Sequence, residues 1–183
     1  MAAENITDAR ILSDDAAHRP SAAFMRRHVA HWIALGFGSG LSPWAPGTVG
    51  TLWAWVAFLV LDRWLGPLGW ALVIGASLPI GIWACARTAQ HLAVADPSAI
   101  VWDEVIAFWI VLWLVMPAGF VAQAIAFALF RYFDAAKPGP VGWADRRFKS
   151  ARGLRQGWGI IADDLVAALC TLLVIAIWRF VFA

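Results

Sequence analysis

Apolar residues of this chain are gathered into long runs that turn-forming residues interrupt at a few points only. The Gly66-Pro67 pair ends one run, Pro117-Ala118-Gly119 divides another, and Pro79 marks a kink within a third. The helical segments that these runs predict are Val49–Leu65, Leu68–Ala86, Val105–Met116, Phe120–Phe133 and Gly159–Phe182. Since no run alternates like a strand, the pattern predicts an all-α protein.

The composition places these helices in a membrane. Of the 183 residues, 62% are apolar and only 14% are charged, whereas soluble domains are nearer half apolar and a quarter charged. Disorder, a coiled coil and a nucleic-acid-binding surface are therefore excluded. We expect a polytopic helical membrane protein with about four to five membrane-embedded helices. Residues 1–27 are polar and predict a flexible N-terminal tail, and residues 28–183 predict a single membrane-embedded domain.

The basic residues indicate how the helices are arranged. Crossing a bilayer takes roughly 20 apolar residues, and the two segments around Pro117 are shorter. If they form a hairpin, either crossing twice or re-entering, every Lys and Arg except Arg63 and Arg179 lies on one side. The positive-inside rule makes this side cytoplasmic. A single crossing would instead separate Asp103 from Asp134 by about 45 Å, so the sequence favours the hairpin.

Acidic residues collect on the same side. Beyond the N-terminal tail only Asp62 lies opposite, and the others lie at cytoplasmic ends of predicted helices: Asp96, Asp103, Glu104, Asp134, Asp145, Asp163 and Asp164. Carboxylates near lipid are costly unless they are hydrated, paired or bound to metal. Oxygen ligands without a Cys or His cluster suit Mg²⁺. We therefore expect a Mg²⁺ site, the alternative being acids solvated in headgroup water and paired with Arg and Lys.

Basic residues interleave with these acids, which points to an anionic substrate. Arg131 precedes Asp134 by three residues, and Lys137 follows it by three. Carboxylates that hold a metal and cations that hold phosphate oxygens are what phosphoryl transfer requires. The glycine-rich segment 36–50 could add backbone N–H groups. Because the Cys-x5-Arg and Asp-x-Asp-x-Thr/Val motifs are absent, metal-assisted attack by water remains.

Four motifs, in order along the chain, resemble those of the phosphatidylglycerophosphatase A family. They are GFGSGLSP and PGTVG at 36–43 and 46–50, IVWDE at 100–104, FRYFD, KP and DR at 130–134, 137–138 and 145–146, and GWGIIADD at 157–164. The resemblance runs from about His31 to Ala168. One departure is Gln156, which stands where the family has a glycine, so no role is assigned to it.

The resemblance implies Mg²⁺-dependent hydrolysis of the terminal phosphate of phosphatidylglycerophosphate, which leaves phosphatidylglycerol, in phospholipid biosynthesis. It also implies a multi-pass protein of the bacterial inner membrane with its active-site loops on the cytoplasmic side. The expected partners are this phospholipid substrate and membrane lipids, with no nucleic acid. Two alternatives stay open: a lipid phosphomonoesterase for another headgroup, such as phosphatidate, and a membrane scaffold or transporter without enzymatic activity.

Each candidate site residue has an expected role. The expected Mg²⁺ ligands are Asp103, Asp134, Asp163 and Asp164. The expected catalytic residues are Asp103, Glu104 and Asp164, with Glu104 or Asp164 as the general base on a water molecule held by the metal. The expected contacts to the substrate phosphate are Ser39, Gly40, Thr48, Arg131, Lys137 and Arg146.

Overall fold

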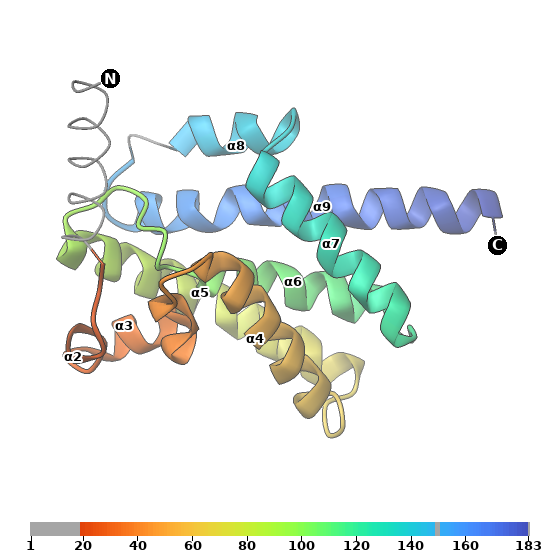
Figure 1. The fold of residues 1–183 in the computed structure, drawn as a ribbon, viewed down its shortest axis with the longest axis horizontal. Coiled ribbons are helices and arrows are strands. Elements are labelled where there is room, and N and C mark those ends of the chain that lie inside the picture. Colours follow the sequence, from red (N-terminus) through yellow and green to blue (C-terminus); the bar gives the residue numbers. More distant parts are fainter. Residues whose placement is uncertain (1–18, 149–150, 183) are drawn as a thin grey trace, which may run out of the picture.

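The computed structural model describes residues 19–148 and 151–182, and within them every regular element is a helix, as predicted (Figure 1). The helices are α2 (Ala22–Met25), α3 (Val29–Ala34), α4 (Pro46–Leu61), α5 (Pro67–Leu92), α6 (Trp102–Val115), α7 (Phe120–Ala136), α8 (Pro140–Phe148) and α9 (Leu154–Phe182), with the 3-10 segment η1 (Gly36–Leu41) between α3 and α4. Of the predicted tail, residues 1–18 lie outside this description. The remainder contains α2, in which Met25 is buried.

All five predicted apolar helices are present, as α4, α5, α6, α7 and α9, but several bounds differ. Helix α4 begins at Pro46, because proline suits the first helical turn, where its missing N–H costs nothing. Helix α5 runs through Pro79 and ends only before Ala93, which adopts a left-handed conformation. Helix α9 begins at Leu154, so Asp163 and Asp164 lie inside this helix and not at its start.

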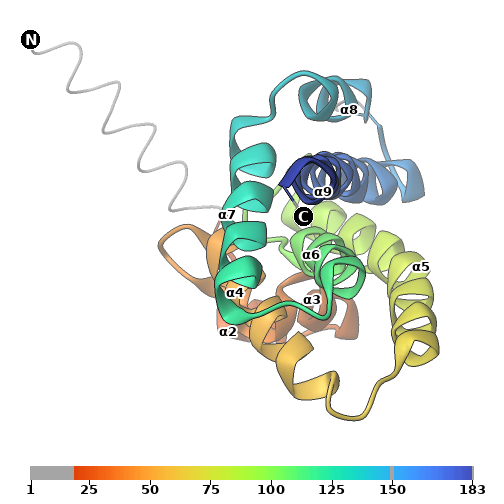
Figure 2. The same ribbon diagram turned by 90° about the vertical axis from the view of Figure 1, so that its right-hand side faces the viewer.

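Helix α6 lies at the centre of the molecule, in contact with α4, α5, α7 and α9 (Figures 1 and 2). Most of its side chains between Trp102 and Val115 are buried. Its neighbours therefore provide its apolar surroundings. The apolar side chains of this 14-residue helix are thus covered mainly by protein.

Helices α6 and α7 form the predicted hairpin. The chain reverses between Met116 and Gly119, and the two helices then contact each other. Asp103 at the start of α6 and Asp134 near the end of α7 line the same cavity. This shared position excludes the alternative in which the two segments form one continuous crossing.

Within residues 19–148 and 151–182, two helices are long and apolar enough to cross a membrane: α5 with 26 residues and α9 with 29. Helices α4, α6 and α7 have 16, 14 and 17 residues, fewer than the roughly 20 that a crossing requires. Length and composition thus support two spans and not the predicted four to five. The sequence-based count is higher because it included every apolar run, whatever the length of its helix.

Polar side chains join the helices within the apolar core. The indole N–H of Trp109 donates to the carbonyl of Ala54 (2.9 Å), which links α6 to α4. The indole N–H of Trp55 on α4 donates to Gln123 on α7 (2.7 Å), and the Gln123 amide donates to the carbonyl of Ala118 (2.8 Å). Because each of these buried polar groups has a partner, they position the helices at little cost.

Two glycines allow α5 to approach its neighbours closely. A Cβ added at Gly81 would lie 2.7 Å from Cδ1 of Trp102 on α6. A Cβ added at Gly157 on α9 would lie 2.0 Å from the carbonyl oxygen of Ile82 on α5. The absence of side chains at these positions lets α6 and α9 converge on α5, and this convergence brings Asp103 close to Asp164.

Candidate active site

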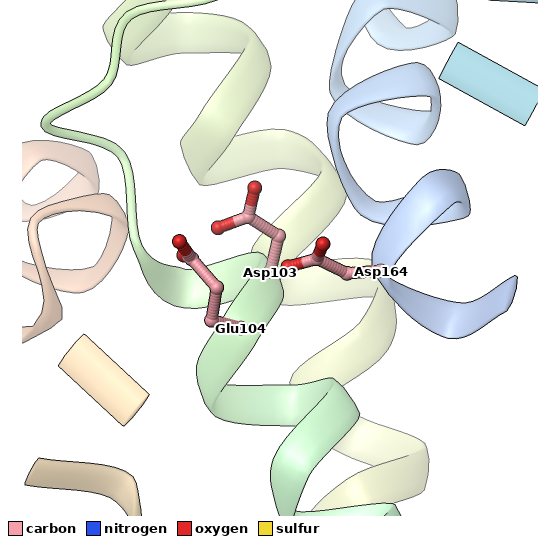
Figure 3. A group of neighbouring side chains, drawn as sticks. All are labelled: Asp103, Glu104 and Asp164. Carbon is pink, nitrogen blue, oxygen red and sulfur yellow. The ribbon is translucent and has the colours of Figure 1, made fainter. Parts of the chain in front are cut away.

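Three carboxylates from two helices converge at the end of the bundle where α6 begins. Asp103 and Glu104 occupy the first turn of α6, and Asp164 lies on α9. The three side chains point toward a common centre (Figure 3). One oxygen from each lies within 4.8 Å of the others. We call these three residues the carboxylate cluster, and its compactness suits the binding of one small cation.

The carboxylate cluster is buried, and each member keeps an oxygen without a hydrogen-bond partner among the described residues: Asp103 Oδ1, Glu104 Oε2 and Asp164 Oδ2. An unpartnered buried carboxylate oxygen is costly, and three like charges add repulsion to that cost. A divalent cation would relieve both effects. The donors are all hard carboxylate oxygens, so the residues present fit Mg²⁺.

Asp103 and Glu104 are both buried in the first turn of α6. Burying two carboxylates side by side is costly. Their place in the first helical turn offsets part of the cost, because the positive end of the helix dipole favours negative charge.

Arg131 on α7 lies beside two carboxylates. Its guanidinium group is hydrogen-bonded to Asp134, three residues later on the same helix, and lies 3.6 Å from Glu104. Asp134 and Glu104 therefore share a cationic partner, whereas Asp103 and Asp164 are in none of the ion pairs recorded among the described residues. The guanidinium has further N–H donors, which suit a phosphate oxygen.

Lys137 connects the end of α7 to two other helices. Its Nζ atom lies 2.6 Å from Oδ1 of Asp145 on α8 and 2.6 Å from Oδ2 of Asp163 on α9. Burial alone would lower the pKa of Lys137, but these two hydrogen bonds outweigh it and raise the pKa above its usual value. Lys137 is thus a protonated bridge at neutral pH, and it neutralises Asp163.

The start of α4 forms the remaining wall. Ala45 is left-handed (φ 42°), Pro46 opens the helix, and no side chain caps its first N–H groups. Such helix ends attract anions. A Cβ at Gly47 would lie 2.2 Å from Oε1 of Glu104 and 3.2 Å from the guanidinium nitrogens of Arg131. Glycine is therefore needed at position 47 for α4 to approach the acidic and basic groups together.

These groups enclose one open cavity of about 260 Å³, which we call the site cavity. Its lining comprises Ala45, Pro46, Gly47, Asp96, Pro97, Ser98, Ile100, Asp103, Glu104, Arg131, Asp134, Lys137, Ile160, Asp163 and Asp164. Carboxylates come from α6, α7, α9 and the segment before α6, whereas the two cations come from the end of α7. Anion-binding and cation-binding groups thus face a single space.

The site cavity contains most of the predicted site residues, namely Asp103, Glu104, Arg131, Asp134, Lys137, Asp163 and Asp164. The residues predicted in segment 36–50 lie differently. The Ser39 hydroxyl donates to the carbonyl of Gly36 (2.9 Å), and Gly40 packs against the carbonyl of Ala99. Neither lines the site cavity. Thr48 lies in the first turn of α4, one residue beyond the lining.

Arg146 is also outside the lining of the site cavity. It lies on α8, near Gly142. Its neighbour Asp145 reaches the site through Lys137. The predicted contact from α8 to the phosphate is therefore not part of this arrangement, and α8 approaches the site through an acidic side chain.

The structure groups the carboxylates differently from the predicted ligand set. Glu104, which also contacts Arg131, joins Asp103 and Asp164. Asp134 and Asp163 lie outside this group and are in ion pairs with Arg131 and Lys137. One sequence signal was available for Asp134, because Arg131 precedes it by three residues and such pairs meet on a helix face. Asp163 offered no comparable signal, since its partner Lys137 is distant in the sequence.

Two further residues were not among the predicted site residues. Gly47 lines the site cavity. The sequence signal for it was the preceding Pro46, because proline favours the first position of a helix and so places Gly47 in the first turn of α4. Gln156, at the start of α9, donates to the carbonyl of Ala95 (2.8 Å). This bond holds the segment that carries Asp96 into the site cavity.

Known proteins resemble this chain over most of its length. The profile of the phosphatidylglycerophosphatase A family matches residues 32–179. Phosphatidylglycerophosphatase A of Escherichia coli K12 is 40% identical over 139 residues, covering 76% of this chain and 77% of the relative. The Haemophilus influenzae protein of the same name is 35% identical over 145 residues, covering 79% and 85%.

A third relative has a different name. A proposed phosphatidylinositol-3-phosphatase of Bacteroides thetaiotaomicron is 38% identical over 157 residues, which cover 81% of this chain and 92% of that protein. No solved structure matches the chain.

Proposed function

The chain belongs to the phosphatidylglycerophosphatase A family, and from this premise we propose that it hydrolyses the terminal phosphate of phosphatidylglycerophosphate, leaving phosphatidylglycerol and inorganic phosphate. One observation carries the proposal. The carboxylate cluster, with its unpartnered oxygens, shares the site cavity with Arg131 and the uncapped start of α4. This combination provides a metal-binding side and a phosphate-binding side within one space.

Asp103, Glu104 and Asp164 are the residues that would hold Mg²⁺. When bound, this ion supplies positive charge that polarises the phosphate and makes water a better nucleophile. Asp134 and Asp163 take a supporting role in the proposal, because Arg131 and Lys137 neutralise them. This assignment revises the expected ligand set of four aspartates.

The chain's own residues bind and orient the substrate. Arg131 donates to the phosphate oxygens, and Asp134 holds its guanidinium group in place. The first turn of α4 has no side-chain cap, and its Gly47 lines the site cavity, so this helix start adds to the anion site. Glu104 is adjacent to both Gly47 and Arg131. We therefore propose that Glu104 is the general base, which accepts the proton of the attacking water.

The proposed location is the inner membrane of a bacterium, with the site cavity at the cytoplasmic headgroup level. Helices α5 and α9 support membrane crossing by length and composition. In the proposed topology the shorter helices α4, α6 and α7 are also embedded, with α6 surrounded by protein. The excess of basic residues on the side of the site cavity supports the cytoplasmic orientation.

A second candidate is hydrolysis of a lipid phosphomonoester with another headgroup, either phosphatidate or a phosphoinositide. The Bacteroides thetaiotaomicron relative, named for phosphatidylinositol 3-phosphate, favours this possibility. The side chains in the site cavity recognise a phosphate group and bind a cation. All these lipids carry such a phosphate, so these side chains do not distinguish their headgroups. Headgroup choice therefore has to be measured.

The deciding experiment measures phosphate release from mixed micelles. The substrates are phosphatidylglycerophosphate, phosphatidate and phosphatidylinositol 3-phosphate, each with Mg²⁺ or with EDTA. We expect Mg²⁺-dependent release that is fastest from phosphatidylglycerophosphate. Asp103→Asn should abolish nearly all turnover, whereas Asp62→Asn, an acid at the other end of α4, should retain it. Equal release in EDTA would remove the metal from the proposal, and faster release from another lipid would replace the substrate.

A further inference from the structure

An apolar groove lies between α7 and α9, separate from the site cavity. Its volume is about 520 Å³, and its lining is Val115, Ala122, Ile125, Leu129, Val174, Ile175, Trp178 and Arg179. Seven of these side chains are apolar, and the eighth carries a permanent positive charge. An apolar channel with one cation has the chemical pattern of an amphiphile site. We call it the α7–α9 groove.

Arg179 has more hydrogen-bonding capacity than its protein contacts use. One of its N–H groups donates to the carbonyl of Val115 (2.9 Å), and a guanidinium has five such donors. None of the ion pairs recorded among the described residues includes Arg179. The side chain is exposed on the protein surface, so its charge faces whatever surrounds α9.

The position of Arg179 along α9 places it far from the site cavity. Fifteen residues separate it from Asp164, which corresponds to about 22 Å of helix. With Asp164 at the cytoplasmic headgroup level, as proposed above, a hydrocarbon core of about 30 Å leaves the backbone of Arg179 about 8 Å short of the opposite boundary, which its long side chain can approach. A guanidinium group at this depth requires an anionic partner or water.

We propose that the α7–α9 groove binds an anionic phospholipid of the opposite leaflet, with an acyl chain along the groove and its phosphate at Arg179. Basic groups between membrane helices are known to bind lipid headgroups in this way. No carboxylate lines the groove, so the ammonium of a zwitterionic headgroup would have no partner there. The inference rests on the membrane crossing of α9 but not on the reaction in the site cavity.

The test uses the full-length protein, delipidated in a neutral detergent, and measures its melting temperature. Dioleoylphosphatidylserine is the probe, because its phosphate is a diester that the proposed phosphatase reaction does not cleave. Dioleoylphosphatidylcholine is the zwitterionic comparison. We expect the anionic lipid to raise the melting temperature by about 5 °C at saturation and the zwitterionic lipid to have little effect. Native mass spectrometry should show one retained anionic lipid per chain.

Four variants locate the binding site. Arg179→Gln keeps a donor for Val115 but removes the charge, so the shift should be lost. Ala122→Phe fills the groove with Arg179 intact, and it should also abolish the shift, which keeps the test valid if Arg179→Gln fails to fold. Two control variants should keep the shift in melting temperature. One is Arg63→Gln, at an exposed basic residue on the same side of the membrane as Arg179, and the other is Arg131→Gln, in the site cavity.

Three results would overturn the inference. A full shift in both Arg179→Gln and Ala122→Phe would place the lipid elsewhere. An equal shift with phosphatidylcholine would mean that any lipid covers the groove. Loss of the shift in Arg131→Gln would assign the binding to the site cavity. None of these results bears on phosphate release, so the failure of this inference and the failure of the proposed function are distinguishable.

Discussion

A buried carboxylate with a cation beside it should respond differently to substitution from one that has none. In the site cavity, Asp134 lies against Arg131, whereas Asp103 and Asp164 each keep an unpartnered oxygen. Removing charge from an unpaired group relieves repulsion and the cost of burial. Removing the negative charge from a paired group, such as Asp134, leaves the half-buried cation beside it with less compensating charge. At the residue scale, neighbouring acids of one cavity thus have opposite effects on stability.

This contrast leads to a first expectation for metal-free protein. In EDTA, Asp164→Asn should raise the free energy of unfolding by about 1 kcal/mol, and Asp134→Asn should lower it by about 1–3 kcal/mol. With Mg²⁺, Asp164→Asn should nonetheless release phosphate at least about 100-fold more slowly. Thermal unfolding in detergent and a phosphate assay measure the two effects. A destabilised Asp164→Asn in EDTA would show that this acid is already compensated without metal.

Gly47 provides a second expectation at this scale. In Gly47→Ala the new methyl group would collide with Glu104 and crowd Arg131. Displacing groups of a reaction site by about 1 Å can cost about 100-fold in rate, so we expect a loss of this size with little change in melting temperature. Gly75→Ala is the matched control, because a Cβ there meets nothing within 4 Å. Wild-type kinetics for Gly47→Ala would show that α4 does not position the site.

The central position of α6 depends at the element scale on how closely its neighbours approach. Trp102 and Ile106 of α6 lie directly against Gly81 of α5. Helices that approach so closely have no room for an added methyl group, and packed interiors relax only partly when atoms are inserted. The close packing that encloses α6 also sets the direction of its first turn, which carries Asp103 and Glu104.

Two glycine substitutions in α5 separate helix propensity from packing. Gly75→Ala should raise the free energy of unfolding by about 0.5–1 kcal/mol, because alanine favours the helix and the position is open. Gly81→Ala should lower it by about 1–3 kcal/mol, because the methyl group meets Trp102. Thermal unfolding of both variants in the same detergent makes the comparison. Equal stabilisation by the two would contradict the close α5–α6 contact.

Lys137 gives an expectation for α8. In Lys137→Met the bonds to Asp145 and Asp163 are lost, so hydrogen exchange of the α8 amides should quicken by about 10-fold or more. The raised pKa of Lys137 means that its stabilising contribution is full below its unfolded pKa and is lost as the pH rises through the higher folded pKa. Wild-type α8 should therefore loosen only above about pH 10. Unchanged exchange in Lys137→Met would show that other contacts hold α8.

At the scale of the whole molecule, the proposed topology puts the site cavity and the α6–α7 turn on opposite sides of the membrane. In a background with Cys85→Ala and Cys170→Ala, a cysteine at Gly119 should react with an impermeant thiol reagent added outside cells. A cysteine at Arg152, an exposed residue before α9, should react only after permeabilisation. Labelling of Arg152→Cys from outside would reverse the orientation and the leaflet of both proposed lipid sites.

The sequence alone predicted the helices, and it predicted that their acidic residues lie together at one end of the bundle. Apolar runs of helical length predict helices because backbone groups in apolar surroundings must be hydrogen-bonded within the segment. The positions of Asp103 and Asp134 at the ends of adjacent runs predicted the hairpin, which the structure confirms. The ordered motifs identified the family, since they need only the residues and their order. These inferences use local chemistry and position along the chain.

Only the tertiary structure decided which acids are partnered and which are not. Asp163 and Asp164 are neighbours in the sequence, yet one faces Lys137 and the other joins Asp103. Successive residues of a helix point about 100° apart, so the rotation of α9 against α6 and α7 determines the partner of each. The same packing turns Ser39 away from the site cavity and brings Gly47 into it. Such contacts depend on distances between remote segments, which no local pattern encodes.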